Sequence, residues 1–209
     1  MIAQMSKNIS SFFITQGIIQ EDDREVYVYS FEVLLSASAS FLTLIILAFL
    51  SHTVLETALY LLGFIPLRQI AGGYHAPNHF RCYITMLSVY ALFLLLLFFV
   101  PVDLIFPALI LCAILSTVLV FVFAPSEDSN KPLSSEECAY FRIKSRFFVI
   151  GYVVLIGLLA TFIEDKTVAF ALTLGVFSVA LSLLVNQIRY QKATETSNTA
   201  LCRGEGIDQ

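Results

Sequence analysis

The sequence predicts an all-α integral membrane protein with about six transmembrane helices. Of its 209 residues, 58% are hydrophobic and only 13% are charged, whereas an ordinary soluble domain carries about 25% charged residues. The apolar residues also come in uninterrupted blocks, unlike the alternating faces of a soluble amphipathic helix. These two observations together place the chain in a lipid bilayer.

Four apolar blocks contain no Asp, Glu, Lys or Arg, and a fifth is interrupted only by His52. Each block approaches the roughly 20 residues that a helix needs to cross a hydrocarbon core about 30 Å thick. The blocks are Cys82–Val102, Leu104–Ser126, Phe147–Ile163, Thr167–Ile188 and Val33–Leu55. The spans that we expect are Phe31–Ser51, Thr53–Leu67, Tyr83–Val100, Val102–Ala124, Phe147–Ile163 and Thr167–Gln187.

The second expected span is the weakest, because it is short, contains Glu56 and ends at Pro66. A re-entrant helix is the alternative there. The basic residues favour a full span, since Lys and Arg in short loops mark the cytoplasmic side. Six spans with the N-terminus inside place eleven of the twelve basic residues on that side, all but Lys166. We therefore expect both termini in the cytoplasm.

We expect one membrane domain over residues 1–209. It would comprise an amphipathic N-terminal segment (1–30), a six-helix membrane region (31–187) that includes a cytoplasmic loop (125–146), and a cytoplasmic tail (188–209). Within the N-terminal segment, apolar residues recur every three or four positions from Ile2 to Phe13. This spacing is typical of a helix that lies in the membrane interface. A helix packed on the protein's own loops is the alternative.

Charge and cysteine usage exclude several classes of protein. The net charge of −4 and the absence of a dense basic stripe argue against a nucleic-acid partner. The four cysteines lie far apart and at unlike depths, so neither a disulfide framework nor a zinc knuckle is expected. Residues 1–30 lack the basic start, apolar core and cleavage site of a signal peptide.

One short polar island, residues 68–82 (RQIAGGYHAPNHFRC), interrupts the apolar runs. It places His75, a candidate base, before Cys82, a candidate nucleophile, and an imidazole beside a thiol activates it by taking its proton. In an unbroken helix, residues seven apart are separated by about 10.5 Å of rise. Contact therefore requires a break, which Gly72, Gly73 and Pro77 would provide.

Other interpretations of the island remain open at this point. Cys82 alone is compatible with a small buried hydrophobe, and His75 alone with a hydrogen-bonded interfacial histidine. His75, His79 and Cys82 could also supply three metal ligands. However, Ala76 stands where a zinc-protease helix needs Glu, and Pro77 spoils the helix that would align the ligands. We expect no metal and no cofactor.

Two further polar features are functional candidates. Glu32 lies where the first span begins, and it could orient His75, contact a substrate or simply mark the interface. The loop 125–146 carries a basic face that begins near Lys131. Attraction to lipid headgroups explains that face, and docking of an acidic peptide is the functional alternative.

The pattern Arg68-x-x-Ala-Gly-Gly-x-His75-Ala76-x-x-x-x-x-Cys82 resembles the signature of the accessory gene regulator B family, membrane peptidases of Gram-positive quorum sensing. The resemblance extends over nearly the whole chain. It includes Ala124-Pro125 leading to Lys131-Pro132-Leu133. The chain departs from the family in that loop, where some relatives carry several consecutive lysines.

The resemblance implies a cysteine endopeptidase that acts on a precursor peptide with an amphipathic leader, a pheromone segment and an acidic tail. Cys82 would be the nucleophile and His75 its general base. Cleavage after the pheromone segment would leave an acyl-enzyme thioester, which a cysteine or serine of that segment attacks to close a thiolactone or lactone. The candidates for substrate binding or oxyanion stabilisation are Arg68, Gly72, Gly73, Glu32 and Lys131.

The resemblance also implies a multi-pass protein of a Gram-positive cell membrane, with its active site near the cytoplasmic face, and is compatible with a homodimer. A transporter or export channel for the same pheromone is the alternative function, and a non-catalytic scaffold is a third. A transporter should tolerate Cys82→Ser, which the peptidase should not, and a scaffold should tolerate both Cys82→Ser and His75→Ala.

Overall fold

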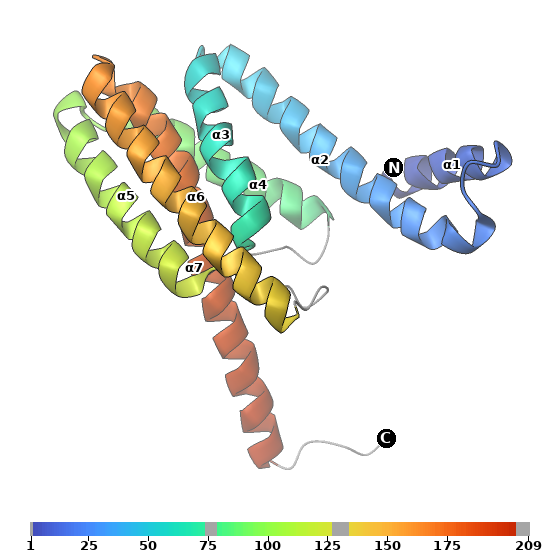
Figure 1. The fold of residues 1–209 in the computed structure, drawn as a ribbon. Helices are drawn as coiled ribbons and strands as arrows, with labels where there is room; N and C mark the ends of the chain where they lie inside the picture. Colours follow the sequence, from blue (N-terminus) through green and yellow to red (C-terminus); the bar gives the residue numbers. More distant parts are fainter. Residues whose placement is uncertain (1, 74–78, 127–133, 204–209) are drawn as a thin grey trace. The chain divides into compact units, whose positions relative to one another are not determined.

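The computed structural model describes residues 2–73, 79–126 and 134–203, with side chains described for 3–73, 80–126 and 134–189. These residues form α-helices and one short 3₁₀ helix, and no strand occurs among them (Figure 1). The elements in chain order are α1 (Ile2–Thr15), η1 (Glu21–Asp23), α2 (Arg24–Leu50), α3 (Val54–Ala71), α4 (His79–Phe99), α5 (Val102–Phe123), α6 (Ser135–Phe162) and α7 (Lys166–Arg203).

Six helices of the described chain, α2 to α7, are long and apolar enough to cross a membrane. The predicted fold class, an all-α membrane protein with six spans, is confirmed. The helix bounds differ from the expected ones at several ends, most clearly at Pro66, at the start of α6 and at the end of α7. Helix α7 continues past the expected end at Gln187 to Arg203.

The expectation that the second span ends at Pro66 is wrong, because α3 continues through this proline to Ala71. A proline inside a helix has no N–H for the carbonyl four residues earlier, which here belongs to Leu62. The hydroxyl of Tyr152 from α6 donates to that carbonyl oxygen at 2.7 Å. A neighbouring helix therefore replaces the hydrogen bond that Pro66 removes, as membrane helices commonly require.

Helix α6 begins at Ser135, well before the expected Phe147, so the later part of the polar segment 125–146 is helical. A capping box starts it: the Ser134 Oγ accepts from the Glu137 N–H at 3.2 Å, and the Glu137 carboxylate accepts from the Ser134 N–H at 2.9 Å. Each side chain thus satisfies an N–H group that the first helical turn leaves unpaired.

The chain forms two compact units, which are described separately. The first comprises Met1–Val54 and Ala76–Leu92. In it α1 packs on α2, and Ser6 and Ser10 are fully buried while Met5 and Phe12 remain 46% and 60% exposed. Helix α1 therefore turns Ser6 and Ser10 inward and leaves Met5 and Phe12 exposed, which suits a helix with one apolar face in the membrane interface.

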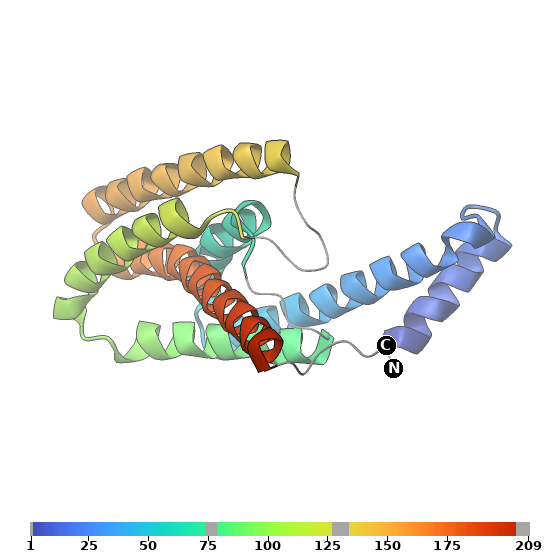
Figure 2. The same cartoon turned by 90° about the horizontal axis from the view of Figure 1, so that it is seen from below.

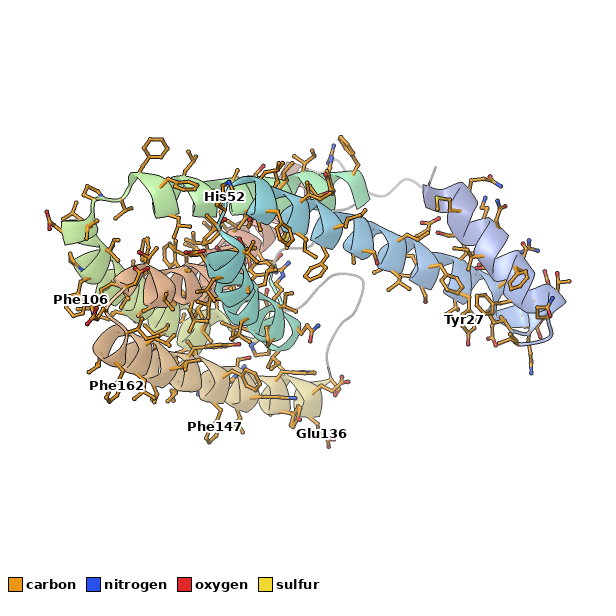
Figure 3. The ribbon with its side chains drawn as sticks, turned by 90° about the horizontal axis from the view of Figure 1, so that it is seen from above. Tyr27, His52, Phe106, Glu136, Phe147 and Phe162 are labelled. Carbon is orange, nitrogen blue, oxygen red and sulfur yellow. The ribbon has the colours of Figure 1, made fainter. Side chains whose placement is uncertain are left out.

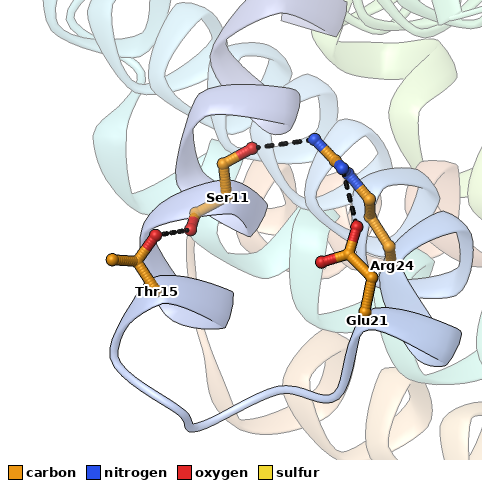
Figure 4. A network of polar contacts seen from close by, with 4 residues as sticks. All are labelled: Ser11, Thr15, Glu21 and Arg24. Atoms are coloured by element: carbon orange, nitrogen blue, oxygen red, sulfur yellow. Dashed lines mark hydrogen bonds and ion pairs between the residues drawn. The ribbon is translucent and has the colours of Figure 1, made fainter.

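Polar and aromatic contacts tie α1 to the beginning of α2. Arg24 forms an ion pair with Glu21 at 2.8 Å and also donates to the Ser11 hydroxyl at 3.2 Å (Figure 4). The rings of Phe13 and Phe31 stack with their centroids 5.7 Å apart. The acidic segment after the N-terminal helix is therefore a structured turn that fixes the angle between α1 and α2.

His52, the only interruption in the first apolar block, lies where α2 has ended (Figure 3). Its φ of 56° is left-handed. The Thr53 N–H donates to the Ala48 carbonyl at 2.9 Å and the His52 N–H to that of Phe49 at 3.3 Å. These two bonds form the Schellman motif that commonly terminates helices. His52 therefore belongs to a turn, not to a span.

The second unit comprises Leu55–His75 and Phe93–Gln209, and α7 is its central helix. Helices α5 and α6 pack on α7 and on each other (Figure 2). Every residue from Ala169 to Val176 is buried. Helix α3 comes close to α7 at two glycines. A Cβ added at Gly63 would lie 2.7 Å from the Leu172 carbonyl oxygen, and a Cβ added at Gly175 would overlap the Tyr60 carbonyl oxygen.

Large apolar side chains cover the outer surfaces of this second unit. Phe106, Phe147 and Phe162 project from α5 and α6 (Figure 3) and are 51%, 72% and 79% exposed. Exposed aromatic residues at this density would be unfavourable in water. They are suited to contact with lipid tails, in agreement with the six spans.

Tyr152→Phe should destabilise the protein by about 1–3 kcal/mol, because it leaves the Leu62 carbonyl without a hydrogen bond. The measurement is the thermal midpoint of the purified protein in lipid nanodiscs. In a Pro66→Ala background the loss should be smaller, since residue 66 then supplies an N–H to the same carbonyl. Equal losses in both backgrounds would contradict this account of Pro66.

Candidate functional site

The end of α3 forms a tight turn at Gly72 and Gly73. Helix α3 stops when the Gly72 N–H donates to the Arg68 carbonyl at 3.1 Å, and the two glycines have φ of 75° and 125°. A Cβ at Gly72 would overlap the Ser126 carbonyl oxygen, and one at Gly73 would overlap the Arg68 guanidinium. Both the backbone conformation and the lack of space therefore require glycine at these positions.

The Arg68 side chain turns back onto this turn. Its Nη1 donates to the Gly72 carbonyl at 3.1 Å and to the Ser182 Oγ of α7 at 2.6 Å. The Ser182 hydroxyl donates its own proton to the Val179 carbonyl at 2.7 Å. Arg68 thus joins the end of its own helix to α7 through charge-assisted hydrogen bonds, which are stronger than neutral ones.

The segment after α5 closes the other side of the turn. The Ser126 N–H donates to the Ala71 carbonyl at 2.9 Å, and Gly72 and Ser126 form an isolated parallel bridge. The Ser126 hydroxyl accepts a hydrogen bond from the Asn186 side chain of α7. We call these six residues the turn cluster: Arg68, Gly72, Gly73, Ser126, Ser182 and Asn186.

Cys82 lies in the first compact unit, in the first turn of α4. Its thiol is free and exposed. The next residue, Tyr83, shares a 3.2 Å hydrogen bond with Thr43 of α2. Because the Thr43 hydroxyl already donates to the Ala39 carbonyl at 2.9 Å, Tyr83 is the donor. This bond attaches the beginning of α4, and with it Cys82, to α2.

The remaining candidates are placed as follows. His75 and Lys131 lie outside the described residues, as does the His79 side chain, so neither the Cys–His dyad nor the metal alternative is tested by the geometry. Glu32 is half-buried in α2. It lines a hollow of about 410 Å³ together with Lys7, Arg24, Glu25, Val28 and Tyr29.

Ser126, Ser182 and Asn186 were not singled out from the sequence, although a signal was present. Ser182 and Asn186 are four residues apart, with only leucine and valine between them, so they share one face of α7. Polar side chains within membrane helices commonly form hydrogen bonds to neighbouring helices. A search for charges alone passes over them.

These features define a multi-pass, all-α membrane protein. Along its sequence, a short polar segment separates the Gly72–Gly73 turn from the free cysteine Cys82. A family model described as Accessory gene regulator B matches residues 5–183. The chain therefore belongs to the accessory gene regulator B family. Membership supports a role in the processing of quorum-sensing pheromones.

Individual relatives agree with this assignment at low identity. Accessory gene regulator protein B of Staphylococcus aureus strain MRSA252 is 25% identical over 138 residues, 66% of this chain and 70% of the relative. An AgrB-like protein of Clostridium beijerinckii is 31% identical over 145 residues, 65% of this chain and 68% of the relative. No solved structure matches the chain.

Gly72→Ala should lower stability more than Gly17→Ala. Both glycines have similar left-handed φ, 75° and 70°, so each alanine pays about 1–2 kcal/mol for the backbone. Only at Gly72 does the added Cβ meet another atom, the Ser126 carbonyl oxygen, whereas nothing lies within 4 Å at Gly17. We expect about 1–3 kcal/mol more loss at Gly72, measured by thermal unfolding in nanodiscs. Equal losses would mean that the Ser126 contact is unimportant.

Proposed function

We propose that this protein is a membrane cysteine endopeptidase that removes the C-terminal tail of a pheromone precursor peptide and closes the remaining segment into a ring. The observation that carries this proposal is the free, exposed thiol of Cys82 at the start of a membrane helix. It occurs within the pattern that resembles the family's signature. Exposure matters because a buried structural cysteine could not reach a peptide bond.

In the first step, His75 accepts the proton of Cys82 and the thiolate attacks the carbonyl carbon of the scissile peptide bond. The C–N bond breaks, and the protonated imidazole returns its proton to the departing amine. The acidic tail leaves and the pheromone segment remains on Cys82 as a thioester. Unpaired N–H groups at a helix start favour a nearby anion, and Cys82 is in the first turn of α4.

In the second step, a thiol of the pheromone segment attacks the thioester carbonyl. His75 accepts the proton of that thiol as it attacks, the new thioester closes the ring, and the Cys82 sulfur leaves and takes the proton back from His75. The exchange is nearly balanced, because a thioester replaces a thioester, so loss of the tail must help to drive the sequence of steps. With a serine in place of the cysteine, the ring would close as a lactone. Water must be excluded throughout, because it would hydrolyse the intermediate.

We assign separate binding sites to the two ends of the precursor peptide, its acidic tail and its amphipathic leader. Lys131 would attract the acidic tail. The hollow lined by Glu32 and Arg24 between α1 and α2 would lie beside the amphipathic leader. A leader held in the membrane plane raises the effective concentration of substrate at the enzyme. We also propose that the site faces the cytoplasm, the side on which a precursor peptide is made, and that two copies can associate.

Intact mass spectrometry of the protein in lipid with a precursor from the same genome tests the chemistry. Wild-type protein should release the tail and carry a mass adduct equal to the leader and pheromone segment. Cys82→Ser and Cys82→Ala should show neither tail release nor adduct, and His75→Ala should release tail at least about a hundredfold more slowly. Release that persists in Cys82→Ala would place the nucleophile elsewhere. Inactivity of every variant, the wild type included, on an intact precursor would favour transport.

Topology reporters test the orientation. A fluorescent protein that matures only in the cytoplasm should be bright when fused to either terminus. An alkaline phosphatase, which is active only outside, should be active when inserted at Glu164, between α6 and α7. Fluorescence at one terminus without the other would contradict a six-span arrangement with both ends inside.

A further inference from the structure

We propose that the hollow between α1 and α2 binds two basic side chains of the precursor's leader, which Glu25 and Glu32 receive two helical turns apart. This inference rests on the proposed function, because the leader belongs to the substrate of that reaction. It adds a requirement on that substrate, a leader helix with Lys or Arg at positions i and i+7 of its polar face.

The first observation is the pattern that α2 presents to the hollow. Its four lining residues, at positions 25, 28, 29 and 32, lie on one face of the helix over two turns. Glu25 and Glu32 stand at the two ends of this face, about 10.5 Å apart along the axis. Val28 and Tyr29 lie between them. The face therefore presents two carboxylates with an apolar and aromatic surface between them.

The second observation is that the basic side chains of the lining do not cancel these two carboxylates. Arg24 is already held by the Glu21 carboxylate at 2.8 Å and donates to the Ser11 hydroxyl at 3.2 Å (Figure 4). Among the described residues that line the hollow, Lys7 of α1 is the other cation. One positive charge thus faces two negative ones, and the hollow favours a cationic ligand.

The third observation is where the hollow lies. One of its walls is α1, which leaves Met5 and Phe12 exposed and suits the membrane interface. An amphipathic leader lies in the same plane. Interfacial helices of this kind commonly carry Lys and Arg on their polar face, and anionic lipids concentrate them at the membrane surface. The leader therefore reaches the hollow with charges that complement its lining.

The spacing of the carboxylates matches a second helix. Side chains at i and i+7 of an α-helix also share one face and lie about 10.5 Å apart. The residues between them would pack on Val28 and Tyr29, while the basic ends reach Glu25 and Glu32. The hollow of about 410 Å³ has room for such side chains. Basic residues only four positions apart would span half this distance and reach one carboxylate.

The test is the binding of designed peptides to the full chain with Cys82→Ala in lipid nanodiscs, measured by fluorescence anisotropy. Two labelled amphipathic helices of about 18 residues, five turns, have the same composition of leucine, serine and two lysines. The lysines lie on the polar face, seven positions apart in one peptide and four apart in the other. After subtraction of binding to empty nanodiscs, the seven-spaced peptide should bind about two- to fivefold more tightly.

Glu25→Gln combined with Glu32→Gln should weaken binding of the seven-spaced peptide about two- to thirtyfold and abolish the preference for its spacing. The matched control is Glu136→Gln with Glu164→Gln, which changes the net charge equally at exposed positions outside the hollow. It should keep the affinity. Lys7→Gln should tighten binding, because it removes a positive charge. Glu25→Lys with Glu32→Lys should instead prefer the peptide whose two lysines are replaced by glutamate.

Several results would overturn the proposal. Equal affinity for the two spacings would do so, as would an equal loss in the Glu25 and Glu32 variant and in its control. Weaker binding by Lys7→Gln would mean that the hollow takes an anionic group. If phosphatidylethanolamine in place of phosphatidylglycerol abolished the spacing preference, the hollow would take a lipid ammonium group. If the double glutamine variant does not fold, the comparison of the two peptides on the parent chain still decides.

Because these measurements use a chain without the Cys82 thiol, they separate binding from chemistry. Tail release by Cys82→Ala in the mass-spectrometric experiment would remove the proposed function and leave the spacing preference unchanged. Cys82-dependent tail release without any spacing preference would remove only the role of the hollow.

Discussion

The close approach of α3 to α7 is the contact on which the second unit depends. Gly63 and Gly175 let the backbones meet without intervening side chains, and Arg68 donates to Ser182 across the same two helices. The two contacts also advance in the same direction along both helices. Helices α3 and α7 therefore run parallel, as the second and sixth spans of a six-span protein must. This parallel packing agrees with six full spans, and the side of the membrane on which the termini lie stays a prediction.

Features written locally in the sequence could be predicted, and those that depend on another helix could not. Charge-free runs were enough to find five of the spans, and the distribution of basic residues favoured the sixth, which contains Glu56. The capping box at Ser134 and Glu137 is also local, and only the polarity of the surrounding segment concealed it. In contrast, α3 continues through Pro66 because the Tyr152 hydroxyl of α6 donates to the Leu62 carbonyl. The proline in the sequence does not reveal that another helix supplies this hydrogen bond.

The same distinction applies to the candidate site. The sequence was enough to select Arg68, Gly72, Gly73 and Cys82, because they lie together in the one polar island between apolar runs. A charged residue, a glycine pair and a cysteine are unusual there. The α7 and Ser126 members of the turn cluster are ordinary polar residues, more than fifty positions from the turn along the chain. Their roles arise from tertiary contacts. The enclosure of the Gly72–Gly73 turn therefore depends on contacts from α7 and from the segment after α5.

The early start of α6 has a consequence for how the protein meets its membrane. Its 28 residues form a rod about 42 Å long, which exceeds a hydrocarbon core of about 30 Å. Arg142, Lys144 and Arg146 therefore lie at graded heights, about 3 Å apart along a rigid axis, instead of on a pliable loop. Bilayer thickness then decides which of these cations lies level with the lipid phosphates: a thinner membrane favours Arg146, and a thicker one favours Arg142.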